Sequence, residues 1–155
     1  MAPHIHVLGL TIQLLDTAAV PLALGYAVGR VGCQLSGDGD YGKATDLPWG
    51  MAYPDGTVRT LDRVQPTPVY ETVTLGLVAL LLWHLRDRMR PGALFSLYLV
   101  LAGVERLLVE FIRRNDHVLL GLTEAQLVSI AMIAGGLTAL ARMRRGGRSL
   151  QPRPA

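Results

Sequence analysis

Four apolar segments, separated by shorter polar ones, dominate the pattern of hydrophobic and polar positions along this chain. They cover residues 11–29, 67–85, 93–112 and 123–141. A transmembrane helix needs about 20 predominantly apolar residues, and each segment is close to that length. We therefore predict an all-α integral membrane protein with about four transmembrane helices, folded as a single membrane domain over residues 1–155.

Proline, glycine and threonine mark the boundaries between these segments. Residues 30–66 form a polar, Gly-rich loop, in which Tyr53-Pro54-Asp55-Gly56 predicts the tip of a small hairpin. Proline costs little at the start of a helix, so Pro66 and Pro68 predict where the second helix begins. The fourth helix is entered through Thr123-Glu124, which reads as an N-cap followed by an acid in the first turn.

The start of the first helix is less plain, because Asp16 and Pro21 interrupt its apolar segment. We expect this helix to begin between Thr11 and Thr17, with Asp16 close to its cytoplasmic end. In the following loop, the aromatic side chains of Trp49 and Tyr53 suit the headgroup level of a bilayer.

The distribution of charge predicts how the helices are oriented across the membrane. The net charge is +3, and almost all the basic residues are arginines, which suit lipid headgroups between apolar segments and argue against nucleic acid as a partner. Eight basic residues and one acidic residue follow the second and fourth segments. The other loops hold six basic residues and six aspartates. The positive-inside rule then places both termini in the cytoplasm, residues 142–155 as a basic cytoplasmic tail with a disordered end, and loop 30–66 outside.

The segment Gly29–Gly42, GRVGCQLSGDGDYG, holds five glycines, and it follows an apolar segment. A glycine-rich loop can bring bare backbone N–H groups to an anion. Arg30 would place a fixed positive charge at the membrane boundary, so the combination suggests bound phosphate; a snorkelling arginine is the alternative.

Asp38 and Asp40 are weak evidence for a cation site and more typical of solvated turns. The single cysteine, Cys33, excludes an internal disulfide and fits packing better than nucleophilic attack, and we expect no metal and no cofactor.

Charged residues also interrupt the third apolar segment. The spacing of Arg106, Glu110 and Arg113 places all three on one face of a helix, while Glu105 points elsewhere and could pair with another helix. An internal salt bridge is the simpler explanation. Within a bilayer, however, ionisable groups usually line a site or a polar cavity, which favours a functional role.

Four motifs occur in an order that resembles bacterial prolipoprotein diacylglyceryl transferase: GRVGCQLSGDGDYG, QPTPVYE, GVERLLVEFIRRND and LTEAQLVSIAMI. The resemblance covers about Asp16 to Met132. It implies a multi-pass enzyme of the bacterial plasma (inner) membrane that needs no cofactor. Such an enzyme moves a diacylglyceryl group from phosphatidylglycerol to the lipobox cysteine in the signal peptide of a prolipoprotein.

The resemblance also assigns site residues. It matches Arg30, at the lipid phosphate, and Arg106 to the family's essential arginines, with Glu110 in register. The candidate catalytic residues are therefore Arg30, Arg106 and Glu110. The candidate substrate-binding residues are Arg30, Gly32, Cys33, Gly37, Asp38, Gly42, Tyr70, Glu71 and Arg113. Helix capping in the first turn of the second helix explains Tyr70 and Glu71 almost as well.

The chain departs from the family in several ways. Cys33 stands where many members have asparagine, Gln65 replaces a histidine, and Leu107 replaces a phenylalanine. The chain resembles only the C-terminal half of the family, and nothing in it matches an essential H-G-G segment of the N-terminal half. The alternatives are a short or N-terminally truncated transferase and a non-catalytic membrane subunit that binds anionic phospholipid. A small transporter subunit ranks below both.

Overall fold

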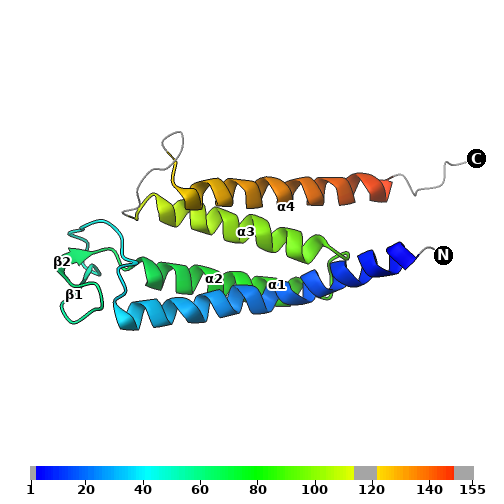
Figure 1. Cartoon of the computed structure of the whole chain (residues 1–155). Helices are drawn as coiled ribbons and strands as arrows, with labels where there is room; N and C mark the ends of the chain where they lie inside the picture. The colour runs from blue at the N-terminus through cyan, green and yellow to red at the C-terminus, as the bar shows by residue number, and fades with distance from the viewer. Residues whose placement is uncertain (1–2, 114–121, 149–155) are drawn as a thin grey trace, which may run out of the picture.

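The computed structural model describes residues 3–113 and 122–148, which form four helices and one two-stranded sheet (Figure 1). The elements, in chain order, are α1 (Pro3–Ser36), β1 (Met51–Tyr53), β2 (Thr60–Val64), α2 (Thr67–Leu85), α3 (Ala93–Glu110) and α4 (Glu124–Arg148). This confirms the predicted helical fold with a small hairpin. By length and composition, three stretches could cross a membrane: Leu10–Ser36, Thr67–Leu85 and Glu124–Arg145.

The helices lie side by side, with the β1–β2 hairpin at one end of them (Figure 1). α1 begins and α4 ends at the opposite end. α1 packs along α2, α4 packs along α3, and α3 also contacts α1 and α2. α3 is therefore the helix through which the two pairs are joined.

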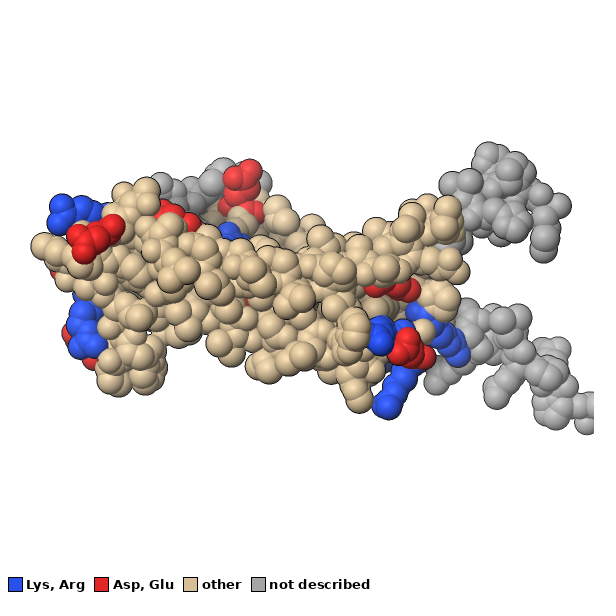
Figure 2. Space-filling model, turned by 90° about the horizontal axis from the view of Figure 1, so that it is seen from below, with Lys and Arg blue, Asp and Glu red and all other residues tan. Residues whose placement is uncertain are grey.

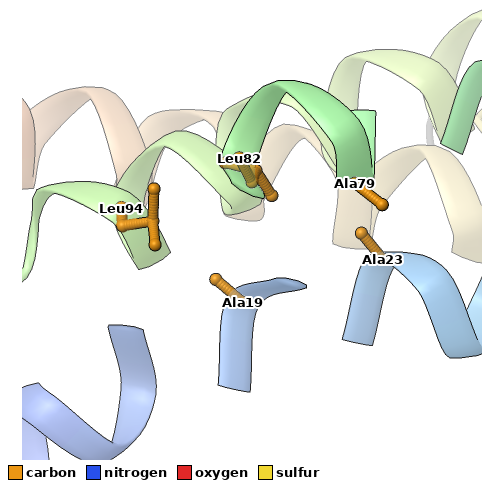
Figure 3. Close-up of a cluster of buried hydrophobic side chains, with 5 residues drawn as sticks. All are labelled: Ala19, Ala23, Ala79, Leu82 and Leu94. Carbon is orange, nitrogen blue, oxygen red and sulfur yellow. The ribbon is translucent and has the colours of Figure 1, made fainter. Parts of the chain in front are cut away.

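Small side chains make up much of the contact between α1 and α2. Ala19, Ala23 and Ala79 pack with Leu82 and Leu94 in one buried cluster (Figure 3). Small residues let helix backbones approach closely, which is how helices associate in lipid, where burying apolar surface gives little driving force. The core therefore has the composition of a membrane bundle.

The large apolar side chains lie mostly on the outside. Leu14, Leu77 and Leu80 are each about three-fifths exposed or more. Figure 2 shows one face on which charged side chains gather toward the two ends and leave an almost uncharged band between them. An apolar surface of this extent matches lipid rather than water.

α1 differs most from its prediction. It starts at Pro3 instead of between Thr11 and Thr17, and it continues through Pro21 to Ser36. Asp16 is thus inside the helix, where its Oδ2 accepts a hydrogen bond from the backbone N–H of Gly92 (2.6 Å) and its Oδ1 accepts one from Phe95 (2.8 Å). These two amides lie at the N-terminus of α3, so Asp16 caps another helix across the bundle.

The other helix starts agree with the sequence. Pro66 precedes α2 and Pro68 lies in its first turn. At α4, the backbone N–H of Gln126 donates to Thr123 Oγ1 (3.2 Å) and that of Thr123 donates to Gln126 Oε1 (3.0 Å). This reciprocal pair is a capping box, so the predicted N-cap is confirmed. α4 continues to Arg148, and the last residues of the expected tail, 149–155, lie outside the described residues.

The hairpin forms where it was predicted. β1 and β2 are antiparallel, with Tyr53 opposite Thr60, and the chain turns just after Tyr53. Tyr53 itself is buried and stacks on Tyr41, with ring centroids 4.2 Å apart. Its expected place in a headgroup belt is therefore wrong, whereas the Trp49 side chain is exposed.

Candidate functional site

A chain of ion pairs of alternating sign connects the loop after α1 with three helices. Asp40 bridges two arginines, because it pairs with Arg113 on one side and with Arg30 on the other. Arg30 Nε then lies 2.8 Å from Glu71 Oε2 of α2. Residues far apart in the sequence therefore meet in one network.

The chain continues into α3 through the same glutamate. Arg106 Nη1 donates to Glu71 Oε1 at 3.2 Å, and Arg106 Nη2 lies 3.9 Å from Glu110 Oε2. Glu71 thus holds one arginine on each carboxylate oxygen. Arg106 and Glu110 lie on one helix face and pair with each other, as predicted. Arg113 pairs instead with Asp40 of the loop.

Most of these charges are shielded from solvent. The side chains of Glu71 and Glu110 are fully buried, and Arg113 is 5% exposed. Burial of a charge costs several kcal/mol unless an opposite charge compensates it, which explains the continuous pairing. Burial lowers the pKa of Arg113, and the positive charge of Arg30 acts in the same direction. Arginine nevertheless stays protonated in proteins, so the pair with Asp40 remains ionic.

The network lies near the hairpin end of the bundle. Arg30 precedes the end of α1 at Ser36 by less than two turns, and Glu71 follows the start of α2 by about one turn. Arg106 lies about one turn before the end of α3. Three helices therefore contribute charges at a similar depth, close to one end of the apolar band.

Arg30 is held from several directions. Its Nη2 donates to the hydroxyl of Tyr26 at 2.6 Å, and its guanidinium lies 4.9 Å from the centre of that ring. Its Nη1 lies 3.8 Å from Cys33 Sγ, one turn further along α1. An arginine held in this way is a fixed charge at the centre of the network, not a side chain that snorkels to solvent.

The glycine-rich segment does not form the expected loop in which free backbone N–H groups bind an anion. α1 runs through Gly29 and Gly32 to Ser36, and left-handed φ values occur only later, at Gly37 (+58°) and Gly39 (+96°). The N–H of Gly37 already donates to the carbonyl of Cys33 at 3.1 Å. The expectation of such a loop is therefore wrong, and side chains supply the positive charge.

Gly42 has a steric role instead. Its backbone forms an antiparallel bridge with Arg113, and its N–H donates to the carbonyl of Gln65 at 2.8 Å. A Cβ at this position would lie 3.0 Å from both Gln65 Cβ and Ile112 Cγ2. Gly42 therefore lets the loop approach the end of α3 closely enough for Asp40 to reach Arg113.

Gly42→Ala is expected to lower the free energy of unfolding by about 1–3 kcal/mol, the usual effect of overpacking. The matched control is Gly29→Ala in the same glycine-rich segment. A Cβ at Gly29 has nothing within 4 Å, and alanine favours a helix by up to about 1 kcal/mol, so this variant should be as stable as the original or more so. Thermal unfolding of both variants in one detergent measures the difference. Equal destabilisation would contradict this role of Gly42.

Two candidates lie apart from the arginines. Asp38 is exposed, and its Oδ1 accepts a hydrogen bond from the N–H of Asp40 at 3.2 Å. Tyr70 accepts a hydrogen bond from Trp49 Nε1 at 2.7 Å, which ties α2 to the loop. Cys33, Asp38 and Asp40 place possible ligand atoms within 4.8 Å of one another. Because Asp40 is already neutralised by two arginines, this group lacks the negative charge that a divalent cation needs.

The bridging role of Asp40 was not predicted from the sequence, in which its surroundings are typical of a solvated turn. Lys43 was not predicted to have a role either, yet its Nζ donates to the carbonyl of Phe111 just after α3 at 3.1 Å. The signal for Asp40 was indirect: buried arginines need carboxylates, and Asp40 lies in a loop that can reach Arg30 and Arg113.

A small cavity lies next to the network, among all four helices. Its volume is about 170 Å³, and it is lined by Tyr26, Leu75, Tyr98, Ala102, Glu105, Arg106 and Met132. Most of this lining is apolar, and Arg106 belongs to both the cavity and the chain of ion pairs. The arrangement therefore places buried guanidiniums, which carboxylates balance in this structure, next to an apolar space, and this combination suits an amphipathic anion such as a phospholipid.

Helices suited to a bilayer and a buried arginine–carboxylate network define an integral membrane protein with a candidate anionic-lipid site. The family model described as prolipoprotein diacylglyceryl transferase matches residues 8–142. The chain therefore belongs to the prolipoprotein diacylglyceryl transferase family, which confirms the resemblance found in its motifs.

Curated relatives agree with this assignment. The chain is 36% identical over 133 residues to the phosphatidylglycerol–prolipoprotein diacylglyceryl transferase of Desulfotalea psychrophila, covering 78% of this chain and 47% of the relative. It is 33% identical over 129 residues to that of Clostridium tetani, covering 81% and 51%. For that of Idiomarina loihiensis the identity is 32% over 140 residues, covering 86% and 51%. The chain thus spans about half the length of the curated relatives it matches.

Proposed function

We propose that this chain transfers a diacylglyceryl group from phosphatidylglycerol to a lipobox cysteine in the signal peptide of a prolipoprotein, using Arg30 and Arg106 to hold the lipid phosphate. One observation carries the proposal: both guanidiniums contact the same buried carboxylate of Glu71, at 2.8 and 3.2 Å. Two guanidiniums that share one carboxylate lie close enough to share one phosphate, which also offers several oxygens to such donors.

The reaction needs charge stabilisation at the phosphate. The cysteine thiolate attacks the glycerol carbon that carries the phosphate oxygen, so a C–S bond forms and a C–O bond breaks. The electron pair stays on that oxygen, and glycerol phosphate leaves with a second negative charge. Arg30 and Arg106 would stabilise this developing charge, because fixed donors are most effective where water is scarce. Two of the other candidates, Glu71 and Glu110, would position the two arginines.

The site is proposed to face the outside of the bacterial inner membrane, with both termini in the cytoplasm. Arg86, Arg88 and Arg90 follow the end of α2 that lies away from the hairpin, and α4 ends there with further arginines. Basic residues next to membrane helices favour the cytoplasmic side. The hairpin end, with the arginine network, would then meet a signal peptide that is being exported.

A transfer assay tests this function. The purified chain in phosphatidylglycerol vesicles, given a lipobox peptide, should increase the mass of the peptide by one thioether-linked diacylglyceryl group. Arg106→Ala should lower the rate by about 10²–10³-fold, the usual effect of removing one donor to a developing charge. Arg88→Ala, an exposed arginine at the opposite end, is the control.

The assay also decides between the candidate functions. If phosphatidylglycerol binds but the peptide is never modified, the chain is the non-catalytic lipid-binding subunit instead. If the lipid neither binds nor reacts, the site is not a phospholipid site. Transfer that does not depend on Arg106 would contradict the assigned role of the two arginines.

A further inference from the structure

Glu105 is a buried carboxylate that the chain of ion pairs leaves out, within the residues that the structure describes. It lies 8% exposed on α3, one residue before Arg106, and it faces α2. Its Oε1 accepts a hydrogen bond from Thr74 Oγ1 at 3.3 Å. The expectation that Glu105 pairs with another helix is thus correct, but its partner is a hydroxyl group and not a cation.

The surroundings of Glu105 connect it to the anion site. Glu105 and Arg106 line the same cavity of about 170 Å³. Tyr26 lines it too, and its hydroxyl accepts a hydrogen bond from Arg30. The cavity is therefore bordered by Arg106 and by the tyrosine that holds Arg30, so a lipid phosphate on these arginines would lie beside the Glu105 carboxylate.

The other carboxylates of the site are already engaged. Glu71 contacts Arg30 and Arg106, and Asp40 contacts Arg30 and Arg113. To accept a proton, each would have to give up the attraction of an ion pair. Glu105 gives up no ion pair when it is protonated, because its partner is a hydroxyl group, which can hydrogen-bond to a carboxylate and to a carboxylic acid alike.

We propose that Glu105 is the general base that removes the proton from the lipobox cysteine thiol. This inference rests on the proposed transferase function and deepens it. A carboxylate in largely apolar surroundings can act in general acid–base catalysis near neutral pH, and Glu105 has such surroundings from Leu75, Ala102 and Met132.

The proposed reaction forms one C–S bond, breaks one C–O bond and moves one proton through Glu105. The thiol proton moves to a Glu105 carboxylate oxygen, and the thiolate attacks the glycerol carbon of the lipid. The C–S bond forms, the C–O bond breaks, and its electron pair stays on the phosphate oxygen beside Arg30 and Arg106. The leaving phosphate has become a dianion, which can take the proton from Glu105 because its second ionisation lies near pH 6. Glu105 is then ready for another turnover.

Glu105→Gln tests the assignment in the same transfer assay. Glutamine keeps the volume of the side chain and an oxygen that accepts from Thr74, so the fold should be unchanged. Phosphatidylglycerol should bind at least as tightly, because a negative charge beside its phosphate is removed. With a cysteine peptide, kcat should fall by about 10²–10³-fold, within the usual range for a lost general base. The matched control is Glu124→Gln, an exposed acid at the start of α4, which should keep the original rate.

A selenocysteine peptide separates catalysis from structure. A selenol is already ionised at neutral pH, so it needs no base, and Glu105→Gln should transfer to it within about tenfold of the unsubstituted chain, since a general base contributes to proton transfer alone. Equal loss with thiol and selenol, or no loss with either, would overturn the role of Glu105 and leave the transferase function standing. If the unsubstituted chain transfers to neither peptide, the transferase function itself fails, and the assignment of Glu105 falls with it.

Discussion

Arg30→Ala is expected to impair diacylglyceryl transfer strongly and to lower the stability of the chain at the same time. Arg30 lies between Asp40 and Glu71, and Glu71 is fully buried. Removing one partner of a buried ion pair typically costs about 3–5 kcal/mol, because the other charge is left uncompensated. The loss of one phosphate ligand should also lower the transfer rate by at least about 10²-fold. Thermal unfolding in detergent and the transfer assay measure the two effects separately.

Arg30→Lys distinguishes the two roles. A lysine restores a positive charge near Glu71, but its single ammonium group cannot reproduce the separate contacts that Arg30 makes with Asp40, Glu71 and Tyr26. We therefore expect part of the stability to return while transfer stays strongly impaired. Arg88→Ala, at the other end of the bundle, should change neither property. Full transfer by Arg30→Lys would contradict the account, because a fixed guanidinium would then be unnecessary.

Glu71→Gln is expected to destabilise the fold while strengthening anion binding. Glutamine keeps the shape of the side chain, but Arg30 and Arg106 lose the negative charge that they share. Arg30 keeps its pair with Asp40 and Arg106 keeps its pair with Glu110, but the carboxylate between the two guanidiniums is gone and they repel each other. The free energy of unfolding should therefore fall by several kcal/mol, up to about 3–5. The network then carries a net positive charge, which should hold a phosphodiester more tightly, by about tenfold or more, since opposite charges in a site of low dielectric attract strongly.

Two measurements on the Glu71→Gln protein check the predicted loss of stability and the predicted gain in lipid affinity. Thermal unfolding without lipid should show the lower stability, and titration with short-chain phosphatidylglycerol should show the higher affinity. Asp62→Asn, an exposed acid on β2, controls for the general loss of a negative charge. If Glu71→Gln weakens lipid binding, or leaves stability unchanged, the phosphate does not bind where Glu71 now holds the two arginines.

Local signals explain how much of the fold could be predicted from the sequence. The prolines at the start of α2, the turn after Tyr53 and the threonine cap of α4 act on their immediate neighbours, so they were identified correctly. The end of α1 could not be found in this way, because Gly29 and Gly32 resemble loop residues. Glycine is tolerated in membrane helices, where it costs less than it does in water.

The site was predictable only as far as spacing allowed. Arg106 and Glu110 share a helix face through their separation along α3, and the structure shows them near each other at 3.9 Å. Asp40 and Asp16 gained their roles from elements distant in sequence: Asp40 reaches Arg113, and Asp16 caps α3. Such contacts depend on how the helices pack. They could therefore not be predicted from the sequence neighbours of either residue.

The most direct test of the central claim is a crystal structure of the chain grown in a lipid phase that contains phosphatidylglycerol. We expect a lipid phosphate within hydrogen-bonding distance of both Arg30 and Arg106, with an acyl or glycerol group entering the cavity beside Glu105. A phosphate bound at Arg86–Arg90, or a lipid that contacts neither Arg30 nor Arg106, would contradict this claim.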